Sequence, residues 1–244
     1  MEGSILSVVI PAYNEEKYIG PLLQKVAALD LSRYAIAKEI IVVDDGSSDR
    51  TAEIAGSFEG IVLKRLPRNR GKGEAVRTGV ECAAGDYLMI QDADLEYDPR
   101  DYIPMIEAIL RDDVDAVYGS RYLKYPRRGK LVNLLTGKHP QQSWFAYLGG
   151  QSLSFVAWFY TGFYLTDTVT ALKLFRRGTL VNMRLESSGF ELDHEITAKI
   201  SARKGRIKEV RVRYYPRSRE EGKKIGLKDW FIGVRAYSRY RQDH

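Results

Sequence analysis

Residues 85–99, GDYLMIQDADLEYDP, place a short apolar run directly before a cluster of carboxylates. The run 86–91 has the length and composition of a buried strand. Acidic side chains follow it at Asp92, Asp94, Glu96 and Asp98. Carboxylates gathered at the end of a strand are typical of a site that holds a positive group, so the stretch predicts a sheet element with a cation site beyond it.

Strand and helix patterns alternate through the first half of the chain, with short connections between them. The expected strands are 5–10, 39–44, 60–66, 86–91 and 115–120, and the expected helices are 15–29, 48–57, 72–84 and 99–111. This alternation predicts a Rossmann-like α/β fold, with an open, mostly parallel sheet and helices on both faces.

Ligands of such sheets bind beyond the carboxyl ends of the strands. The sequences at those ends are PAYNE (11–15), DDGSSD (44–49), RNRGKG (68–73) and DADLE (92–96). Most of the unusual polar residues therefore converge on one edge of the expected sheet.

The net charge of +6 is unevenly distributed over the 244 residues. Residues 201–244 contain fourteen Lys or Arg and five Asp or Glu, while the remainder is slightly acidic. A basic end on an acidic body predicts contact with phosphate on a membrane, a substrate or a nucleic acid, and a solvated helix face is the alternative. The single cysteine, Cys82, rules out an intramolecular disulfide, suits a reducing cytosol and favours a buried structural thiol.

Residues 140–166 carry no charge and are rich in aromatic side chains. Because Trp and Tyr favour the headgroup level of a bilayer, we expect helices that present aromatics to a membrane interface, with core helices or a membrane span as alternatives. The N-terminal sequence MEGSILSVVI reads as a first strand rather than a signal peptide.

The C-terminal sequence GLKDWFIGVRAYSRYRQD, residues 226–243, has apolar residues at helical spacing with basic residues between them. A basic amphipathic helix suits an anionic lipid surface, and a helix packed on the body of the protein fits equally well. The expected domain organisation is a catalytic domain over 1–218, with the aromatic insert at about 140–166, followed by this helix over 219–244.

Two further motifs supply chemistry at the predicted edge. IIVVDDGSSDRT (40–51) ends a strand with Asp44 and Asp45, whose carboxylates can accept hydrogen bonds from a base or a ribose. RNRGKGEAVRTG (68–79) opens a helix with Lys72 near its start, a suitable neighbour for a diphosphate, although its spacing matches neither a P-loop nor GxGxxG.

Asp92 and Asp94 alternate on an extended chain, so both side chains can face one divalent ion, and Glu96 is available as a third ligand. Hard carboxylate oxygens favour Mg²⁺ or Mn²⁺. Such an ion would help a nucleoside diphosphate to depart.

The motifs occur in an order that resembles the family 2 glycosyltransferases of GT-A fold, closest to the dolichyl-phosphate mannose synthase and polyprenyl-phosphate group. The matching stretches are VVIPAYNEEKYI (8–19), IIVVDDGSSDRT (40–51), NRGKGEAVRTG (69–79), GDYLMIQDADLEYDP (85–99), YGSRY (118–122), DTVTALKLF (167–175) and GFELDHEI (189–196). Together they extend over roughly residues 5–215, which is most of the chain.

The resemblance implies a nucleotide-sugar donor, a divalent metal and an inverting transfer. Position by position, it implies that the nucleotide sugar is bound by Pro11, Tyr13, Glu15, Asp44, Asp45 and Asp92, and Lys72 joins this set from its place at the helix start. The implied metal ligands are Asp92, Asp94 and Glu96, the last standing where the group often has glutamine. Ala171 replaces the glycine of the family's DTxxGxK stretch, which leaves the shape of the sugar pocket open.

The acceptor decides the mechanism. A lipid phosphate is already an anionic nucleophile near neutral pH, so transfer to it needs no general base. The resemblance implies that Arg121 faces this phosphate, and the other basic residues expected to offset its charge are Arg127, Arg128, Lys130, Arg217, Arg219, Lys223 and Lys224. A sugar hydroxyl would need a base, for which Asp193 is the candidate, with Glu191 and Glu195 nearby, and His194 is expected to pack or cap rather than bind metal.

The leading hypothesis is a metal-dependent enzyme that transfers a sugar to polyprenyl or dolichyl phosphate, with Asp94, Arg121 and Asp193 as catalytic candidates. Mannose from GDP-mannose is favoured, and glucose or an N-acetylhexosamine from a UDP-sugar is the next option. A family 2 enzyme acting on a soluble glycan or peptide hydroxyl is the alternative. A nucleic-acid-binding module is disfavoured because the acidic strand ends would repel a phosphate backbone.

The expected partners are the donor, the lipid-phosphate acceptor and a membrane surface, with a small membrane-anchoring protein as an open option and no nucleic acid. The expected location is cytoplasmic, peripheral on the cytosolic membrane face.

Overall fold

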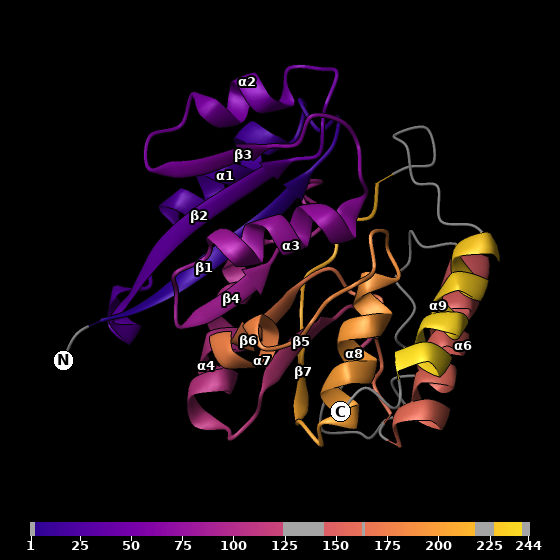
Figure 1. Ribbon diagram of the computed structural model, residues 1–244. Coiled ribbons are helices and arrows are strands. Elements are labelled where there is room, and N and C mark those ends of the chain that lie inside the picture. Colours follow the sequence, from indigo (N-terminus) through magenta and orange to yellow (C-terminus); the bar gives the residue numbers. More distant parts are fainter. Residues whose placement is uncertain (1–2, 124–143, 163, 218–226, 241–244) are drawn as a thin grey trace.

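The computed structural model describes residues 3–123, 144–162, 164–217 and 227–240. Its strands form one seven-stranded sheet in the order β3-β2-β1-β4-β6-β5-β7. The strands are β1 (Ser4–Ala12), β2 (Ile36–Asp44), β3 (Ile61–Arg65), β4 (Tyr87–Ile90), β5 (Ala116–Ser120), β6 (Lys173–Arg176) and β7 (Ile207–Arg211). The prediction of an open, mostly parallel α/β sheet is confirmed (Figure 1).

The helices between the strands begin and end close to the expected positions. They are α1 (Ile19–Ala28), α2 (Thr51–Gly56), α3 (Lys72–Cys82), α4 (Tyr102–Arg111), α6 (Trp144–Thr161), α7 (Arg177–Val181), α8 (Leu192–Ala202) and α9 (Leu227–Tyr240), with short 3₁₀ turns η1 (Ser32–Tyr34) and η2 (Pro99–Asp101). The helix expected from residue 15 begins only at Ile19, because residues 13–18 form a turn beyond β1.

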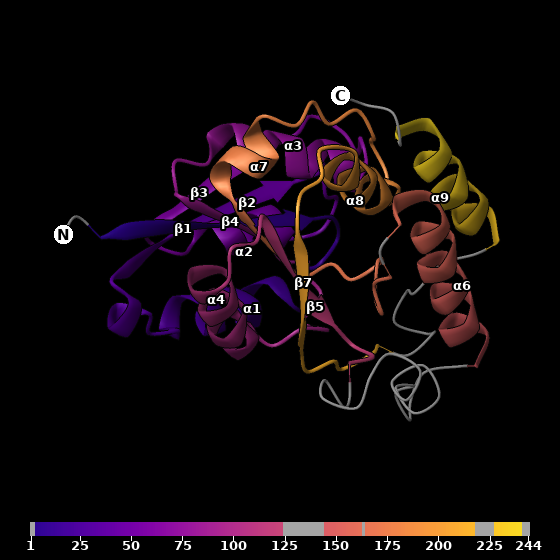
Figure 2. The same cartoon turned by 90° about the horizontal axis from the view of Figure 1, so that it is seen from below.

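The two faces of the sheet carry separate cores. Strand β1 has seven consecutive buried residues, as expected for a central parallel strand covered on both sides. Side chains of α1 and α4 pack on one face, and those of α3, α7 and α8 pack on the other. Figure 2 shows these two layers, with α6 and α9 lying beyond α8 at one end of the molecule. The helices are therefore stabilised by apolar burial against both faces.

The sequence pattern did not predict the last two strands of the sheet, β6 and β7. Strand β6 lies between two predicted strands. It runs antiparallel between β4 and β5, and Lys173 at its start pairs with Ile90 on one side and Tyr118 on the other. Strand β7 then extends the sheet parallel to β5. Because β6 runs in the opposite direction, its first residue lies at the same edge as the carboxyl ends of β4 and β5.

Candidate active site

The carboxyl edge of the sheet brings together most of the predicted site residues. Asp44 ends β2, Asp92 and Asp94 follow β4, and Arg121 follows β5. Helix α3 begins at Lys72 beside this edge. Strands β2 and β4 both pair in parallel with β1. Asp44, Asp92 and Asp94 therefore lie at the same edge of the sheet.

Asp45 shapes the glycine-rich segment before α3. Its two carboxylate oxygens accept hydrogen bonds from the backbone N–H groups of Arg70 (2.7 Å) and Gly71 (2.8 Å). Gly71 has φ = 94°, a conformation that favours glycine. Asp45 is buried. Its carboxylate therefore fixes the loop, and its predicted contact with the nucleotide stays a prediction.

Gly73 allows α3 to start against the segment 187–188. Its N–H donates to the carbonyl of Ser188 at 2.6 Å, and a Cβ at this position would lie 2.2 Å from the carbonyl oxygen of Ser187. Glu195 holds this segment from α8, because its carboxylate accepts from the N–H groups of Glu186 and Ser187, each at 2.8 Å. These contacts join α3 and α8 at the edge of the site.

Asp44 is fully buried at the end of β2. Its carboxylate accepts from the N–H of Ser47 at 3.2 Å and lies 3.1 Å from Nε of Arg65. Farther along the edge, Pro11 is buried within β1, whereas Tyr13 lies just beyond it and is 46% exposed. As nucleotide ligands these three predicted residues remain predictions.

Lys72 connects two carboxylates across the site. Its Nζ lies 2.9 Å from Asp92 Oδ1 and 3.5 Å from Asp193 Oδ2. Burial alone would lower the pKa of Lys72, but the charges of Asp193 and Asp92 outweigh burial and raise its pKa above the ordinary value. The ammonium group is therefore charged and held at the edge where the donor is expected.

Arg217, which follows β7, lies among three acidic residues. Its guanidinium is 3.1 Å from Asp94 Oδ2 and 3.1 Å from Glu15 Oε2. Its backbone N–H donates to Glu96 at 3.0 Å. Arg217 therefore lies against carboxylates expected to bind donor and metal, and its contact with the acceptor phosphate stays a prediction.

Asp94 carries negative charge that its surroundings do not balance. Burial and the charges of Asp92 and Glu96 raise its pKa to about 7, although Arg217 lowers it. Asp92 Oδ1 is buried and, apart from its ion pair with Lys72, has no hydrogen-bond partner among the described residues. A site with excess carboxylate charge and such an oxygen fits a hard divalent cation.

Glu96 is engaged by hydrogen bonds from two other groups. Its carboxylate accepts from the hydroxyl of Tyr214 at 2.9 Å and from the N–H of Arg217 at 3.0 Å. Within the described ranges, no three His, Cys, Asp or Glu side chains are arranged as a metal cluster. The role of Glu96 as third ligand stays a prediction that requires these hydrogen bonds to open.

Arg121 forms a bidentate ion pair with Asp167, a residue that the sequence analysis did not single out. The two nitrogen–oxygen distances are 2.6 and 2.7 Å, and the side chain of Asp167 is fully buried. The guanidinium also lies 5.3 Å from the Tyr122 ring and 5.1 Å from the Tyr214 ring. In this position Arg121 stabilises the segment after α6, and its contact with an acceptor phosphate stays a prediction.

Lys173 and Asp193 form a buried ion pair behind Lys72. Lys173 Nζ donates to Asp193 Oδ1 and to the carbonyl of Thr170. Burial would raise the pKa of Asp193, but the charges of Lys173 and Lys72 outweigh it and lower the pKa. Lys173 was not among the predicted site residues, although it occupies the lysine position of the DTVTALKLF stretch.

His194 packs inside the protein, as expected. Its ring lies edge-on to Tyr237 with centroids 5.1 Å apart, and a Cβ on Gly233 would lie 2.6 Å from its Nε2. Burial lowers the pKa of His194 to about 4. The predicted acceptor ligands Arg128 and Lys223 lie outside the described residues, as do Arg127, Lys130, Arg219 and Lys224.

Helices α6 and α9 expose an aromatic surface away from the sheet. The exposed large apolar side chains on this surface are Leu148, Phe155, Trp158 and Phe159 of α6 and Phe231 and Ile232 of α9. The inner sides of the two helices pack together and against α8 through Ala157, Ala198, Ala236 and Tyr237. None of the described helices combines the length and the apolar character needed to cross a membrane.

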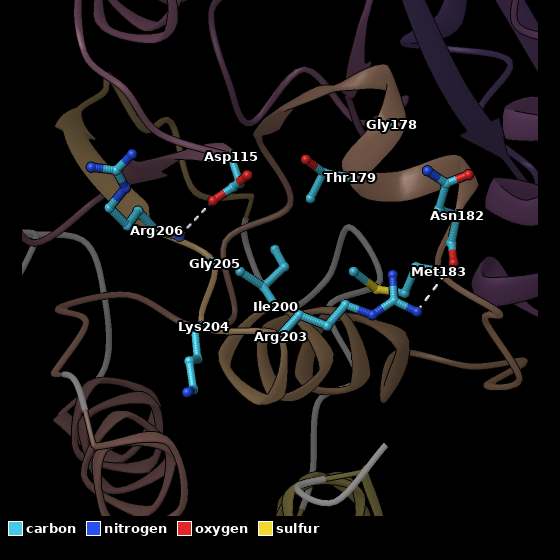
Figure 3. A pocket seen from close by; sticks show the side chains of 10 residues that line it. All are labelled: Asp115, Gly178, Thr179, Asn182, Met183, Ile200, Arg203, Lys204, Gly205 and Arg206. Carbon is cyan, nitrogen blue, oxygen red and sulfur yellow. Dashed lines mark hydrogen bonds between the residues drawn. The ribbon is translucent and has the colours of Figure 1, made fainter. Parts of the chain in front are cut away.

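A separate hollow of about 460 Å³ lies at the opposite edge of the sheet (Figure 3). Arg203, Lys204 and Arg206 line it together with Asp115 and α7. Two of these cations have structural partners, since the guanidinium of Arg203 donates to the carbonyl of Asn182 at 3.1 Å and that of Arg206 pairs with Asp113. None of the residues that line this hollow belongs to the candidate site at the carboxyl edge.

Comparison with known proteins identifies a matching family model and several related enzymes. A model of the family "Glycosyl transferase family 2" matches residues 7–177. A dodecaprenyl-phosphate galacturonate synthase from Rhizobium johnstonii is 34% identical over 186 residues, which cover 74% of this chain and 50% of that protein. A UDP-N-acetylglucosamine–dolichyl-phosphate N-acetylglucosaminyltransferase from Methanococcus voltae is 29% identical over 228 residues, covering 85% of this chain and 83% of that protein.

Among solved structures, the glucosyl-3-phosphoglycerate synthase of Mycobacterium tuberculosis, in complex with Mn²⁺, UDP-glucose and phosphoglyceric acid, superposes with a TM-score of 0.69. The match covers 97% of this chain and 80% of that one at 20% sequence identity. At this level of identity the likeness concerns the fold.

Proposed function

The chain belongs to glycosyl transferase family 2 and has a GT-A fold, and from this premise we propose that it transfers a sugar from a nucleotide diphosphate to a polyprenyl or dolichyl phosphate. The observation that carries the proposal is the pair Asp92 and Asp94 at the carboxyl edge of the sheet, flanked by Lys72 and Arg217. Carboxylates bind a metal and the cations attract phosphate, so the edge is suited to a metal-bound diphosphate.

In this proposal Asp92 and Asp94 hold a divalent ion, Mn²⁺ or Mg²⁺. The ion supplies Lewis-acid stabilisation of the departing diphosphate when it is bound. Lys72 is close enough to Asp92 to contact the same diphosphate. Arg217 lies beside Asp94. We expect it to move towards the acceptor phosphate when a metal ion neutralises the carboxylate charge.

The acceptor class is proposed from the relatives and from charge. Both relatives described above are named for transfer to a lipid phosphate. An anionic phosphate oxygen can attack the sugar carbon directly, so the chain's residues need only orient it and offset its charge. The proposed acceptor ligands are Arg121 and Arg217 and, outside the described ranges, Arg128 and Lys223.

The donor is proposed as GDP-mannose, with UDP-glucose and a UDP-N-acetylhexosamine as the other candidates. The relatives differ in the sugar that their names specify, galacturonate in one and N-acetylglucosamine in the other. The base contacts come from backbone and loop shape around Asp44 and Asp45, which the motifs do not encode.

We also propose that the enzyme acts while docked peripherally on the cytosolic face of a membrane, through the aromatic surface of α6 and α9. Phe159 is 76% exposed, and Trp158 lies beside it. Exposed aromatic rings on an uncharged helix are costly in water and favourable at the headgroup level of a bilayer. Arg235 and Arg239 are exposed on the neighbouring helix and would meet anionic headgroups.

A donor and acceptor screen tests the proposed function. Purified protein is incubated with Mn²⁺, a polyprenyl phosphate and, in turn, radiolabelled GDP-mannose, UDP-glucose and UDP-N-acetylglucosamine. We expect label to enter the organic phase with one donor and only when both metal and lipid phosphate are present. Label that stays in the aqueous phase with every donor would overturn the acceptor assignment.

A further inference from the structure

Four charged side chains of alternating sign run from the core of the sheet to the proposed metal position. Lys173 of β6 contacts Asp193 of α8, Asp193 lies 3.5 Å from Lys72 of α3, and Lys72 lies 2.9 Å from Asp92 after β4. Each residue comes from a different part of the fold. The row therefore depends on the tertiary structure and is not a local sequence pattern.

Lys173 is at the inner end and is fully buried. Its ammonium group contacts Asp193 and the carbonyl of Thr170, and it lies 5.0 Å from the ring of Tyr118. A buried cation is retained only at a cost unless it is paired. Because Lys173 is fully buried, it can act on a ligand only through its neighbours, and Asp193 is the neighbour that connects it to Lys72.

Asp193 has one carboxylate oxygen directed at each lysine. Oδ1 accepts from Lys173, and Oδ2 lies 3.5 Å from Lys72. A general base needs an oxygen within hydrogen-bond reach of the substrate hydroxyl. In this arrangement both oxygens of Asp193 are engaged with cations, which fits a residue that orients its neighbours better than one that abstracts a proton.

We propose that Lys173 and Asp193 are positioning residues for Lys72, which they hold at the carboxylate edge where the diphosphate of the donor binds. The inference rests on the proposed function and deepens it. A lysine side chain is long and flexible, so a fixed carboxylate behind it reduces the freedom lost when it meets phosphate. Preorganised charge of this kind is what stabilises a departing diphosphate.

The test measures nucleotide affinity by isothermal titration calorimetry, using UDP and GDP in the presence of MnCl₂. Lys72→Met should weaken diphosphate binding at least about tenfold, the effect of losing one charge-assisted hydrogen bond. Lys173→Met and Asp193→Asn should each weaken it by about threefold or more, although Lys173 touches no ligand. The donor KM should rise by a similar factor while the acceptor KM is unchanged.

A double-variant cycle separates positioning from general loss of structure. If Lys173 acts through Lys72, then Lys173→Met should add less than about twofold in the Lys72→Met background. Lys38→Met is the control, because Lys38 is a partly buried lysine near the start of β2, far from the carboxyl edge, where its ammonium group donates to the carbonyls of Val26 at 2.8 Å and Ala27 at 2.6 Å. It should leave diphosphate affinity unchanged.

Three results would overturn the inference. One is Lys173→Met with wild-type affinity, another is equal weakening by Lys173→Met in both backgrounds, and the third is Asp193→Asn with intact diphosphate affinity but no turnover, which would make Asp193 a base. If Lys173→Met fails to fold, the diphosphate affinity of Asp193→Asn decides alone: weakened affinity supports the inference, and intact affinity overturns it whether or not turnover remains. Failure of the wild-type protein to bind either nucleotide with Mn²⁺ would instead overturn the proposed function.

Discussion

Asp94 has a pKa raised by burial and by its acidic neighbours, and it has the central chemical role in the proposal. Asn at this position has almost the same shape but no charge for a divalent ion. We expect Asp94→Asn to reduce sugar transfer at least about a hundredfold, because both metal binding and stabilisation of the leaving group are lost. Initial rates at saturating donor and acceptor measure this loss.

The fold should tolerate Asp94→Asn. Burial and neighbouring acids disfavour the charged carboxylate, so the variant should melt at the same temperature as the wild type or higher. Asp98→Asn is the nearby control, since Asp98 caps η2 by accepting from the N–H of Arg100 at 3.0 Å. Full transfer activity in Asp94→Asn would contradict the metal assignment.

Gly73 is the second residue whose identity the site depends on. An added Cβ would lie 2.2 Å from the Ser187 carbonyl oxygen, so α3 cannot keep its place against the segment 187–188. We expect Gly73→Ala to lower the free energy of unfolding by at least about 2 kcal/mol. Chemical denaturation measures this change.

The same substitution at Gly149 in α6 should raise the free energy of unfolding. A Cβ there meets no atom within 4 Å, so Gly149→Ala should stabilise the protein by up to about 1 kcal/mol through helix propensity. Equal effects at Gly73 and Gly149 would show that close backbone approach is not what requires glycine at position 73.

At the scale of elements, the packing of α8 against α9 depends on a neutral histidine. His194 is buried between Tyr237 and Gly233, and burial lowers its pKa to about 4 from the ordinary value of 6.5. The unfolded chain therefore binds a proton that the folded protein does not, so stability contributed by this group is present above pH 6.5 and is lost as the pH falls towards 4.

When the pH is lowered from 7 to 5, protonation linked to this histidine should reduce the free energy of unfolding by about 2 kcal/mol. The measurement is urea denaturation of the wild type and of His194→Gln at both pH values. The variant should lose less stability over this interval because Gln does not titrate. The same pH dependence in both proteins would contradict the packing of a neutral ring at the α8–α9 contact.

At the same scale, the aromatic surface of α6 and α9 is expected to bind lipid vesicles. Phe155 and Phe159 are both exposed on α6, so replacing them should leave the core intact. We expect Phe155→Ser with Phe159→Ser to weaken binding to phosphatidylglycerol-containing vesicles at least about tenfold. Sedimentation with the vesicles measures the fraction of bound protein.

Leu110→Ser is the control for this surface, since Leu110 is also exposed but lies on α4, which covers the other face of the sheet. Equal loss of vesicle binding in both proteins, or no loss in the α6 variant, would contradict docking through α6 and α9.

At the scale of the whole molecule, local patterns predict the fold where consecutive elements alternate. Strands β1 to β5 and the helices between them lie close to the expected ranges because their apolar periodicity is strong. Strand β6 could not be predicted in the same way. It has four residues and pairs between β4 and β5, so it is determined by tertiary contacts.

Part of the candidate site could likewise be predicted from local sequence, and part depends on tertiary contacts. Asp92 and Asp94 could be identified because they directly follow a buried strand. The ion-pair partners of the predicted residues Arg121 and Asp193 could not be identified. Asp167 meets Arg121, and Lys173 meets Asp193, only after distant segments pack together. The contact of Arg217 with Glu15 and Asp94 joins residues about two hundred and one hundred and twenty positions apart, beyond any sequence pattern.

The most direct test of the account is a crystal structure of the protein soaked with MnCl₂ and the sugar nucleotide that supports transfer. Anomalous scattering locates the manganese independently of the protein model. We predict a single strong peak within coordination distance of carboxylate oxygens of both Asp92 and Asp94 and of the donor diphosphate. A peak at another position, or an ordered nucleotide at this edge with no manganese between it and the two aspartates, would contradict the central claim.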